Sequence, residues 1–264
     1  MRARSWVVAT LAASVVLNLG AGGFALKALH DRGGLSYLER RLGLSDAPSA
    51  VPQTSQVETL GLMPDVDGEY IFVGDSLTEA FRWSECFPGS LVQNHGIGGN
   101  RVADVAARLD DVIARRPAGL LVAIGTNDVG DLREPGTIAD DIAEVLDRVA
   151  AGSSETRVVL KAVPPRRGAG LSSRIAELNG LLRDVAAARA VEFVDIYSPM
   201  VGKDGQIRPA MTTDGVHLTA DAYRVWVTET ARTLDDVPGF ASASLAGGDE
   251  MTRVSTVAGP ADGG

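Results

Sequence analysis

Residues 70–79 read YIFVGDSLTE, a short apolar run followed directly by a polar cluster. The run YIFV has the length and composition of a buried strand. The polar residues begin where that strand should end. Polar clusters at the carboxyl ends of parallel strands are where open α/β sheets build their sites. This stretch therefore predicts a parallel sheet with a functional site at the carboxyl ends of its strands.

Three further polar clusters follow downstream. They read NHGIGGN at 94–100, GTND at 125–128 and DGVH at 214–217. The first two again follow apolar runs, LV at 91–92 and LLVAI at 120–124. Together the four clusters supply a nucleophile, amide donors, a base and a carboxylate. Those are the parts of an acyl-transfer site.

The remaining pattern alternates between strands and helices. Strands are expected at 70–74, 90–94, 119–125, 157–163 and 191–197. Helices are expected at 101–115, 136–151, 172–190 and 219–234. This alternation predicts a parallel sheet with helices on both faces. Residues 164–168 read PPRRG, and we interpret them as a mobile loop at the rim of the sheet.

The chain has three candidate bases, His30, His95 and His217. A serine hydroxyl needs a base within hydrogen-bonding reach. His217 follows Asp214 by three residues, and in a helical turn such residues share a face. Asp214 would then bind one ring nitrogen and leave the other facing Ser76, as in a catalytic triad. We interpret His95 as a loop residue near the site.

An acyl-transfer site also needs donors for the oxyanion that forms on the attacked carbonyl. The sequence offers the backbone N–H groups of Ser76 and Gly99 and the side-chain amide of Asn127. Glycine allows close approach of the backbone to substrate, and the amide stays neutral at any working pH. Asp75 and Asp128 are expected to support the site by tying loops together.

Each of these residues alone has an ordinary structural interpretation. Ser76 could cap a helix, the pair at 127–128 could form a turn, and His217 could be a surface residue. The glycines at 96–98 do not continue into a dinucleotide fingerprint, because Arg101 stands where a glycine is needed. One cysteine and no histidine pair at ligand spacing predict neither a metal nor a cofactor. Only a common site explains the joint occurrence of the four clusters.

The four clusters resemble the SGNH (GDSL-type) hydrolase family. The match includes Ser76, Gly99, Asn127 and His217 in the family's order and covers about residues 65–233. The resemblance implies a three-layer α/β sandwich around a mostly parallel, five-stranded, flavodoxin-like sheet. It also implies a serine ester hydrolase that works through an acyl-serine intermediate without a cofactor, and the oxyanion roles given above.

Residues 81–88 and 94–99 are most similar to the acetylhydrolase-like branch of that family. Asn100 and Arg101 depart from this branch, because the family usually has an aspartate or a serine–aspartate pair near position 100. The substrate could be a small-molecule, lipid or sugar ester, and the short loops favour a short acyl group. Alternatives are an O-acyltransferase acting on cell-envelope sugars and a lipase or lysophospholipase. A non-enzymatic binding module is disfavoured because the site residues are intact.

The amino-terminal segment carries a separate signal. Residues 6–26 contain 21 residues without a charge, enough for a helix of roughly 31 Å that crosses a bilayer. Arg2 and Arg4 precede it, which favours an extracytoplasmic domain. We expect residues 1–44 to be an anchor with a juxtamembrane helix. The alternative is a cleaved signal peptide, which normally has a shorter apolar core.

Domain boundaries and charge complete the sequence analysis. We expect a linker at 45–61, the hydrolase domain at 62–235 and a disordered tail at 236–264. The net charge is −9, and residues 1–44 alone carry +4, so the remainder carries −13. Such an acidic domain argues against nucleic-acid partners. Cys86 is the single cysteine, which excludes an internal disulfide.

Overall fold

The computed structural model describes residues 54–168, 170–240 and 243. Five parallel strands form one sheet in the order β2-β1-β3-β4-β5. The strands are β1 (Tyr70–Gly74), β2 (Val92–Gly96), β3 (Gly119–Ala123), β4 (Arg157–Lys161) and β5 (Glu192–Val194). The five-stranded parallel sheet predicted from the sequence is confirmed.

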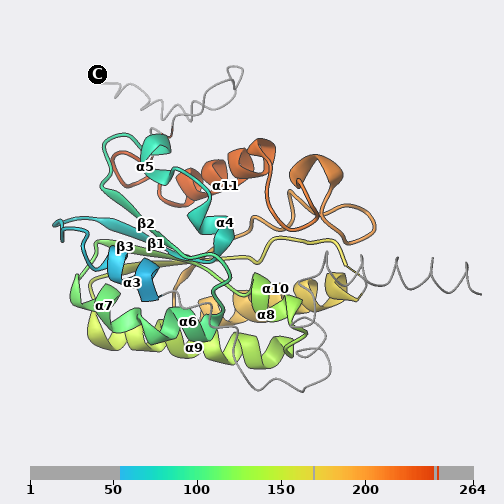
Figure 1. The fold of residues 1–264 in the computed structure, drawn as a ribbon, viewed down its shortest axis with the longest axis horizontal. Coiled ribbons are helices and arrows are strands. Elements are labelled where there is room, and N and C mark those ends of the chain that lie inside the picture. Colours follow the sequence, from blue (N-terminus) through green and yellow to red (C-terminus); the bar gives the residue numbers. More distant parts are fainter. Residues whose placement is uncertain (1–53, 169, 241–242, 244–264) are drawn as a thin grey trace, which may run out of the picture. The chain divides into compact units, whose positions relative to one another are not determined.

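Helices connect the strands and cover both faces of the sheet (Figure 1). The long ones are α9 (Pro135–Gly152), α10 (Leu171–Ala188) and α11 (Ala220–Thr233). The short ones are α3 (Thr54–Leu60), α4 (Ser76–Glu79), α5 (Trp83–Cys86), α6 (Val102–Ala107), α7 (Leu109–Ala114), α8 (Thr126–Gly130) and the 3₁₀ helix η1 (Pro209–Met211).

The alternation of side chains along β1 divides the core into two layers. Ile71 and Val73 pack among the apolar residues of α6, α7, α9 and α10. Phe72, between them, faces the opposite way and packs with residues of α5 and α11. Figure 1 shows α11, α4 and α5 on one side of the sheet and α6 to α10 on the other. This is the three-layer α/β sandwich expected from the alternating strand and helix pattern.

Two local predictions differ from the structure. The helix expected at 101–115 is broken at Arg108, which has φ −109° and ψ 9° between α6 and α7. Strand β2 extends to Gly96, two residues beyond the predicted end at 94, so His95 belongs to a strand and not to a loop. The polar composition of residues 93–95 concealed where the strand ends, because these side chains bind partners inside the protein.

The domain boundaries also differ from the expected ones. Helix α3 occupies the second half of the segment expected to be a linker. Phe240 lies beyond the expected boundary at 235 but is fully buried, with its ring centroid 4.8 Å from that of Tyr70 and 4.6 Å from that of Phe87. The predicted anchor at 6–26 lies outside the described residues. Among the described helices, none has the length and hydropathy to span a bilayer.

The layer that contains α11 includes one buried amine. Lys161, at the end of β4, is fully buried, and its Nζ donates to Oγ1 of Thr230. Nζ also lies 5.0 Å from the ring centroid of Trp226, 5.7 Å from that of Phe72 and 6.0 Å from that of Trp83. Burial in this apolar surrounding lowers the pKa of Lys161 well below its usual value.

We expect Lys161→Met to stabilise the domain at neutral pH. Below a pKa of about 10.4 the unfolded chain protonates the amine, whereas the folded state resists protonation until its own, lower pKa. Stability therefore falls as the pH drops through that window, and methionine removes the loss. The gain should be at least about 1 kcal/mol at pH 7, or about 2–4 °C in Tm, and shrink towards pH 10.

Thermal unfolding of the two proteins at pH 7 and pH 10 measures this difference. Lys161→Ala is the control for volume, because it removes the same charge but leaves a void among the aromatic rings. A methionine variant that melts lower than the parent at both pH values would show that the amine is a net stabilising group.

Candidate active site

The sheet register aligns the ends of three strands. Gly74 at the end of β1 pairs with Gly96 of β2 on one side and with Ala123 of β3 on the other. The loops that follow these strands therefore emerge side by side. The chain order of the strands reverses at β1, and such a switch point is where open α/β sheets place their sites. The first three polar clusters meet here.

Ser76 is the first residue of α4, immediately after β1. Asp75 caps this helix, because its Oδ1 accepts a hydrogen bond of 2.9 Å from the backbone N–H of Leu77. Helix α4 lies directly against the sheet. A Cβ at Gly96 would fall 2.3 Å from the backbone nitrogen of Glu79, so only glycine allows this approach. The glycine that ends β2 thus helps to place Ser76.

Asn94 fixes the far end of α4, a role that the sequence did not suggest. Its Nδ2 donates to the carbonyl oxygens of Thr78 at 3.0 Å and Phe81 at 3.0 Å. Its Oδ1 accepts a 2.9 Å bond from the N–H of Gly96. A single amide therefore ties β2 to the chain that follows Ser76. Only its place in the second polar cluster could have drawn attention to this residue.

His217 and Asp214 approach Ser76 from the segment that precedes α11. The Nε2 atom of His217 lies 3.5 Å from Oγ of Ser76, and its Nδ1 lies 2.6 Å from Oδ2 of Asp214. The helical turn expected for this pair is wrong. The pair lies in a loop closed by an antiparallel bridge between Thr212 and Leu218.

Backbone hydrogen bonds hold this loop in place of helical ones. Oδ1 of Asp214 accepts from the N–H groups of Val216 and His217, each at 2.8 Å. Burial alone would raise the pKa of Asp214, but the hydrogen bonds from the His217 ring and from these two N–H groups lower it to about 2. Asp214 is therefore a carboxylate at neutral pH.

The three expected oxyanion donors lie on adjacent loops. Ser76 begins α4, Gly99 lies in the turn after β2, and Asn127 is the second residue of α8 after β3. Gly99 has φ +79°, a conformation that favours glycine. Asn127 Nδ2 donates to the backbone oxygen of Asn100 at 2.8 Å, which links the second and third loops.

Asp75 and Asp128 each make contacts within the protein beside the site. Asp128 Oδ2 accepts a 3.1 Å bond from the N–H of Val102, and its Oδ1 forms an ion pair of 2.6 Å with Arg133. Both carboxyl groups are buried, and burial raises the pKa of each, that of Asp75 to about 7. Asp75 caps α4, and Asp128 joins α8 to α6. Neither carboxylate is hydrogen-bonded to His217 in the contacts described above.

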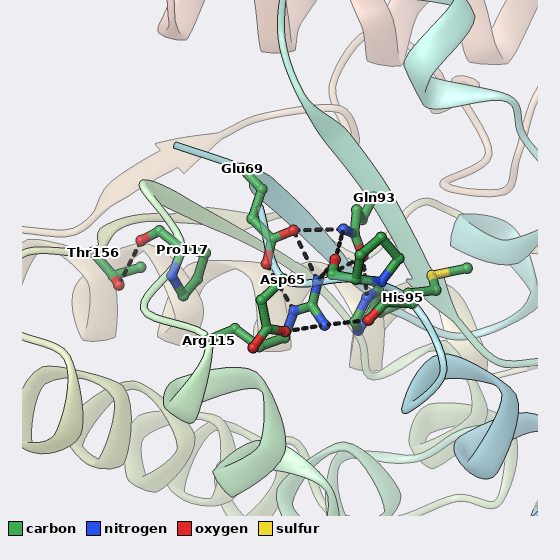
Figure 2. A network of polar contacts seen from close by, with 9 residues as sticks. Asp65, Glu69, Gln93, His95, Arg115, Pro117 and Thr156 are labelled. Carbon is green, nitrogen blue, oxygen red and sulfur yellow. Dashed lines mark hydrogen bonds and ion pairs between the residues drawn. The ribbon is translucent and has the colours of Figure 1, made fainter. Parts of the chain in front are cut away.

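His95 does not line the site. It is buried, and its Nε2 lies 3.1 Å from Oε1 of Gln93. Gln93 in turn bonds Glu69, just before β1, and Arg115 binds both of them, so the ring is directed towards the amino ends of the strands (Figure 2). Burial, assisted by Arg108 and Arg115, lowers the pKa of His95 to about 4.

Arg166 belongs to the site, although no pattern in the sequence predicted a role for it. The loop 164–168 was expected to be mobile, but Pro164 and Pro165 are buried. Nη1 of Arg166 donates to the carbonyl oxygen of Thr126 at 2.7 Å. A Cβ at Gly130 would fall 2.5 Å from the same Nη1, so the guanidinium lies close against α8. Arg166 thereby supports the helix that carries Asn127.

No group of three or more histidine, cysteine or carboxylate side chains that could hold a metal ion occurs within the described ranges. The carboxyl ends of β1 to β3 and the loop before α11 present a serine, a histidine–carboxylate pair and amide donors. The GDSL-like lipase/acylhydrolase family model matches residues 72–225, which include all of these groups. The chain is a member of this family.

Solved structures support the same assignment. This GDSL hydrolase is similar to a GDSL-like lipase from Bacteroides thetaiotaomicron, with 25% identity, a TM-score of 0.55 and coverage of 66% of this chain and 91% of that chain. A Bacteroides fragilis protein, described provisionally as an acylhydrolase, shares 26% identity over 68% of this chain and 94% of that chain, with a TM-score of 0.56.

A third structure shows the fold alone. It is an acetylxylan esterase from Geobacillus stearothermophilus, with 17% identity, a TM-score of 0.54 and coverage of 65% of this chain and 96% of that chain. No curated protein matches the chain. Family and fold together make this GDSL hydrolase an ester hydrolase, as the sequence predicted.

Proposed function

We propose that this GDSL hydrolase cleaves carboxylic esters through an acyl intermediate on Ser76. The observation that carries the proposal is the contact of 3.5 Å between Ser76 Oγ and His217 Nε2, with Asp214 2.6 Å from the opposite ring nitrogen. A proton on Nδ1, donated to Asp214, leaves the lone pair of Nε2 facing the hydroxyl. A nucleophile–base distance at this limit is common in the absence of substrate.

The reaction would proceed in two halves. Ser76 Oγ attacks the ester carbonyl while His217 takes its proton, and the protonated ring then donates that proton to the departing alcohol. Water, deprotonated by the same ring, attacks the acyl-serine, and the acid leaves. In both halves the N–H groups of Ser76 and Gly99 and the amide of Asn127 would bind the oxyanion.

The surroundings of the site favour a short acyl group. The loop after β2 and the loop after α8 are both short, and neither forms a lid. The long segment 195–219 is not a lid either, because Ile196, Met200 and Ile207 anchor it in the core. Among the described residues, the large exposed apolar side chains precede β1 or β2, except for Leu132 after α8.

We expect kcat/KM to be higher for acetyl to butyryl esters than for palmitoyl esters. A long chain would leave much of its surface in water and lose about 0.8 kcal/mol for each exposed CH₂ group. The measurement is kcat/KM for p-nitrophenyl esters from C2 to C16, below the concentration at which they form micelles. A steady rise with chain length would contradict the proposal and indicate a lipase or lysophospholipase.

The same assay separates hydrolysis from acyl transfer. Both reactions use the acyl-serine, but a transferase passes the acyl group to a sugar hydroxyl instead of water. Adding a polyol acceptor and analysing the products decides between them. An acylated polyol that forms faster than free acid would favour the O-acyltransferase over the hydrolase.

We further propose that the hydrolase domain is exported and stays attached to a membrane through residues 6–26. The support is the uncharged length of that segment and the arginines before it. Amino-terminal sequencing of protein recovered from membranes measures this. We expect a start upstream of residue 22, whereas a start between about 22 and 30 in protein from the medium would indicate a cleaved signal peptide.

A further inference from the structure

We propose that Arg108 and Asn100 form a positioning unit that holds the oxyanion donors in place. This inference rests on the proposed function. Arg108 does not reach Ser76 or His217 by any bond described above. It acts through Asn100, which joins the turn that carries Gly99 to the amide of Asn127.

The guanidinium of Arg108 is buried behind that turn. It lies at the break between α6 and α7, and the residue is 6% exposed. Nη2 donates to the backbone oxygen of His95 at 2.7 Å and to Oδ1 of Asn100 at 3.2 Å, and Nε donates to the same Oδ1 at 3.3 Å. One rigid group therefore spans from β2 to the turn that follows it.

These bonds link the guanidinium to uncharged oxygens. Burial lowers the pKa of Arg108 to about 10, although the nearby carboxylate of Asp104 opposes the shift, so the group is still a cation at neutral pH. A buried cation that binds neutral acceptors is costly to keep in a fold. Its forked geometry, which fixes two acceptors at once, offers a reason to keep it here.

Asn100 is held at three points. Its N–H donates to the carbonyl oxygen of Ile97 at 3.1 Å, its Oδ1 accepts from Arg108, and its backbone oxygen accepts from Asn127 at 2.8 Å. The last bond occupies one N–H of the Asn127 amide. Because the NH₂ group is planar, this bond also fixes the direction of the second N–H. It determines which side of the Asn127 amide carries the nitrogen and which carries the oxygen.

Loss of the Arg108 contact should therefore disturb two donors at once. The Gly99–Asn100 peptide would turn, and the backbone beside the Gly99 N–H would move. The backbone oxygen of Asn100, which orients the Asn127 amide, would move with it. A displacement of about 1 Å at such a site costs on the order of 10²-fold in rate. Substrate binding should change little, because the oxyanion forms only after attack.

The test compares Asn100→Ala, Asn127→Ala and the double variant on p-nitrophenyl acetate. We expect Asn100→Ala to lower kcat roughly 10- to 100-fold with KM within about threefold. Asn127→Ala alone should cost roughly 10²- to 10³-fold. If Asn100 acts through Asn127, the double variant should be far more active than the product of the two losses predicts.

Conservative variants and a matched control separate positioning from stability. Asn100→Asp keeps the acceptor for Arg108 and should retain kcat within about threefold, whereas Arg108→Lys, which cannot span both acceptors, should lower kcat about tenfold. Arg115→Met removes another arginine, partly buried, which binds Glu69 and Gln93 at the other ends of the strands (Figure 2). That variant should lower Tm and leave kcat unchanged.

Affinity for a trifluoromethyl ketone adds a second measurement, because its adduct with serine presents an oxyanion. The affinity should weaken in Asn100→Ala by about the same factor as kcat. An unchanged kcat in Asn100→Ala, or fully multiplicative losses in the double variant, would overturn the positioning unit while Ser76→Ala and Asn127→Ala still support the proposed reaction. Full activity of Asn127→Ala would overturn the oxyanion assignment and this inference with it.

Discussion

Ser76→Ala should lower kcat/KM for short acyl esters by a factor on the order of 10⁴ or more. Loss of the nucleophile from such a site removes the covalent route, while oxyanion binding still supports a small residual rate. Alanine keeps the backbone N–H at the start of α4, and Asp75 still caps the helix through the N–H of Leu77. The fold should therefore remain intact, and Tm should change little.

Labelling with a fluorophosphonate tests the same assignment directly. The probe should add once to the parent, and mass spectrometry should place the adduct on Ser76. Ser84, an exposed serine on α5, provides the control, because Ser84→Ala should keep both labelling and turnover. Equal labelling of Ser76→Ala and the parent would show that another residue is the nucleophile.

The sheet and its site were predictable because strong local signals agree with the final structure. The run at 70–73 is apolar at every position. A strand needs apolar side chains at successive positions only when both of its faces are covered. β1 is accordingly buried by helices on both sides of the sheet. The polar cluster that follows each strand then had to meet the others, because parallel strands end at one side of a sheet.

The strand of mixed polarity was harder to place. In β2, the side chains of Gln93, Asn94 and His95 are all polar, and we expected a loop from residue 95 onwards. Each of them has its partners inside the protein: Asn94 holds the chain after α4, and the other two join the network around Arg115. Hydrophobic periodicity cannot locate the end of a strand whose last side chains make hydrogen bonds inside the protein.

The backbone conformation of residues 214–217 also could not be predicted from the sequence. A spacing of three residues indicated that Asp214 and His217 could meet, and they do. The same spacing suggested a helical turn, whereas the two residues lie in a loop fixed by Thr212 and Leu218. Tertiary contacts decide between such conformations, because both allow one carboxylate to bind the ring.

Arg108 and Arg166 show a similar limit. A lone arginine in a helical pattern or after a pair of prolines is typical of an exposed surface residue. Both side chains instead turn inward, where each donates to a backbone oxygen of a distant segment. Their partners, in β2 and α8, lie far away in the sequence, so only the folded chain reveals them.

His217→Ala should abolish measurable turnover of short acyl esters, with a loss on the order of 10⁴-fold or more. The ring at position 217 is the base whose Nε2 lies 3.5 Å from Ser76 Oγ, and the Asp214 carboxylate fixes its tautomer. Asp214→Asn should lose nearly as much, because an amide can hold the ring with the wrong nitrogen protonated. Both residues are about half exposed, so neither change should unfold the domain.

His95→Ala is the matched control because the two histidines differ in what surrounds them. The His95 ring is buried, bonds Gln93 and is directed away from Ser76, so its loss should lower Tm and leave kcat within about threefold. Steady-state kinetics and thermal unfolding of both variants, measured together, separate the two roles. If His95→Ala lost turnover and His217→Ala kept it, the histidine–aspartate pair at 214–217 would not be the catalytic one.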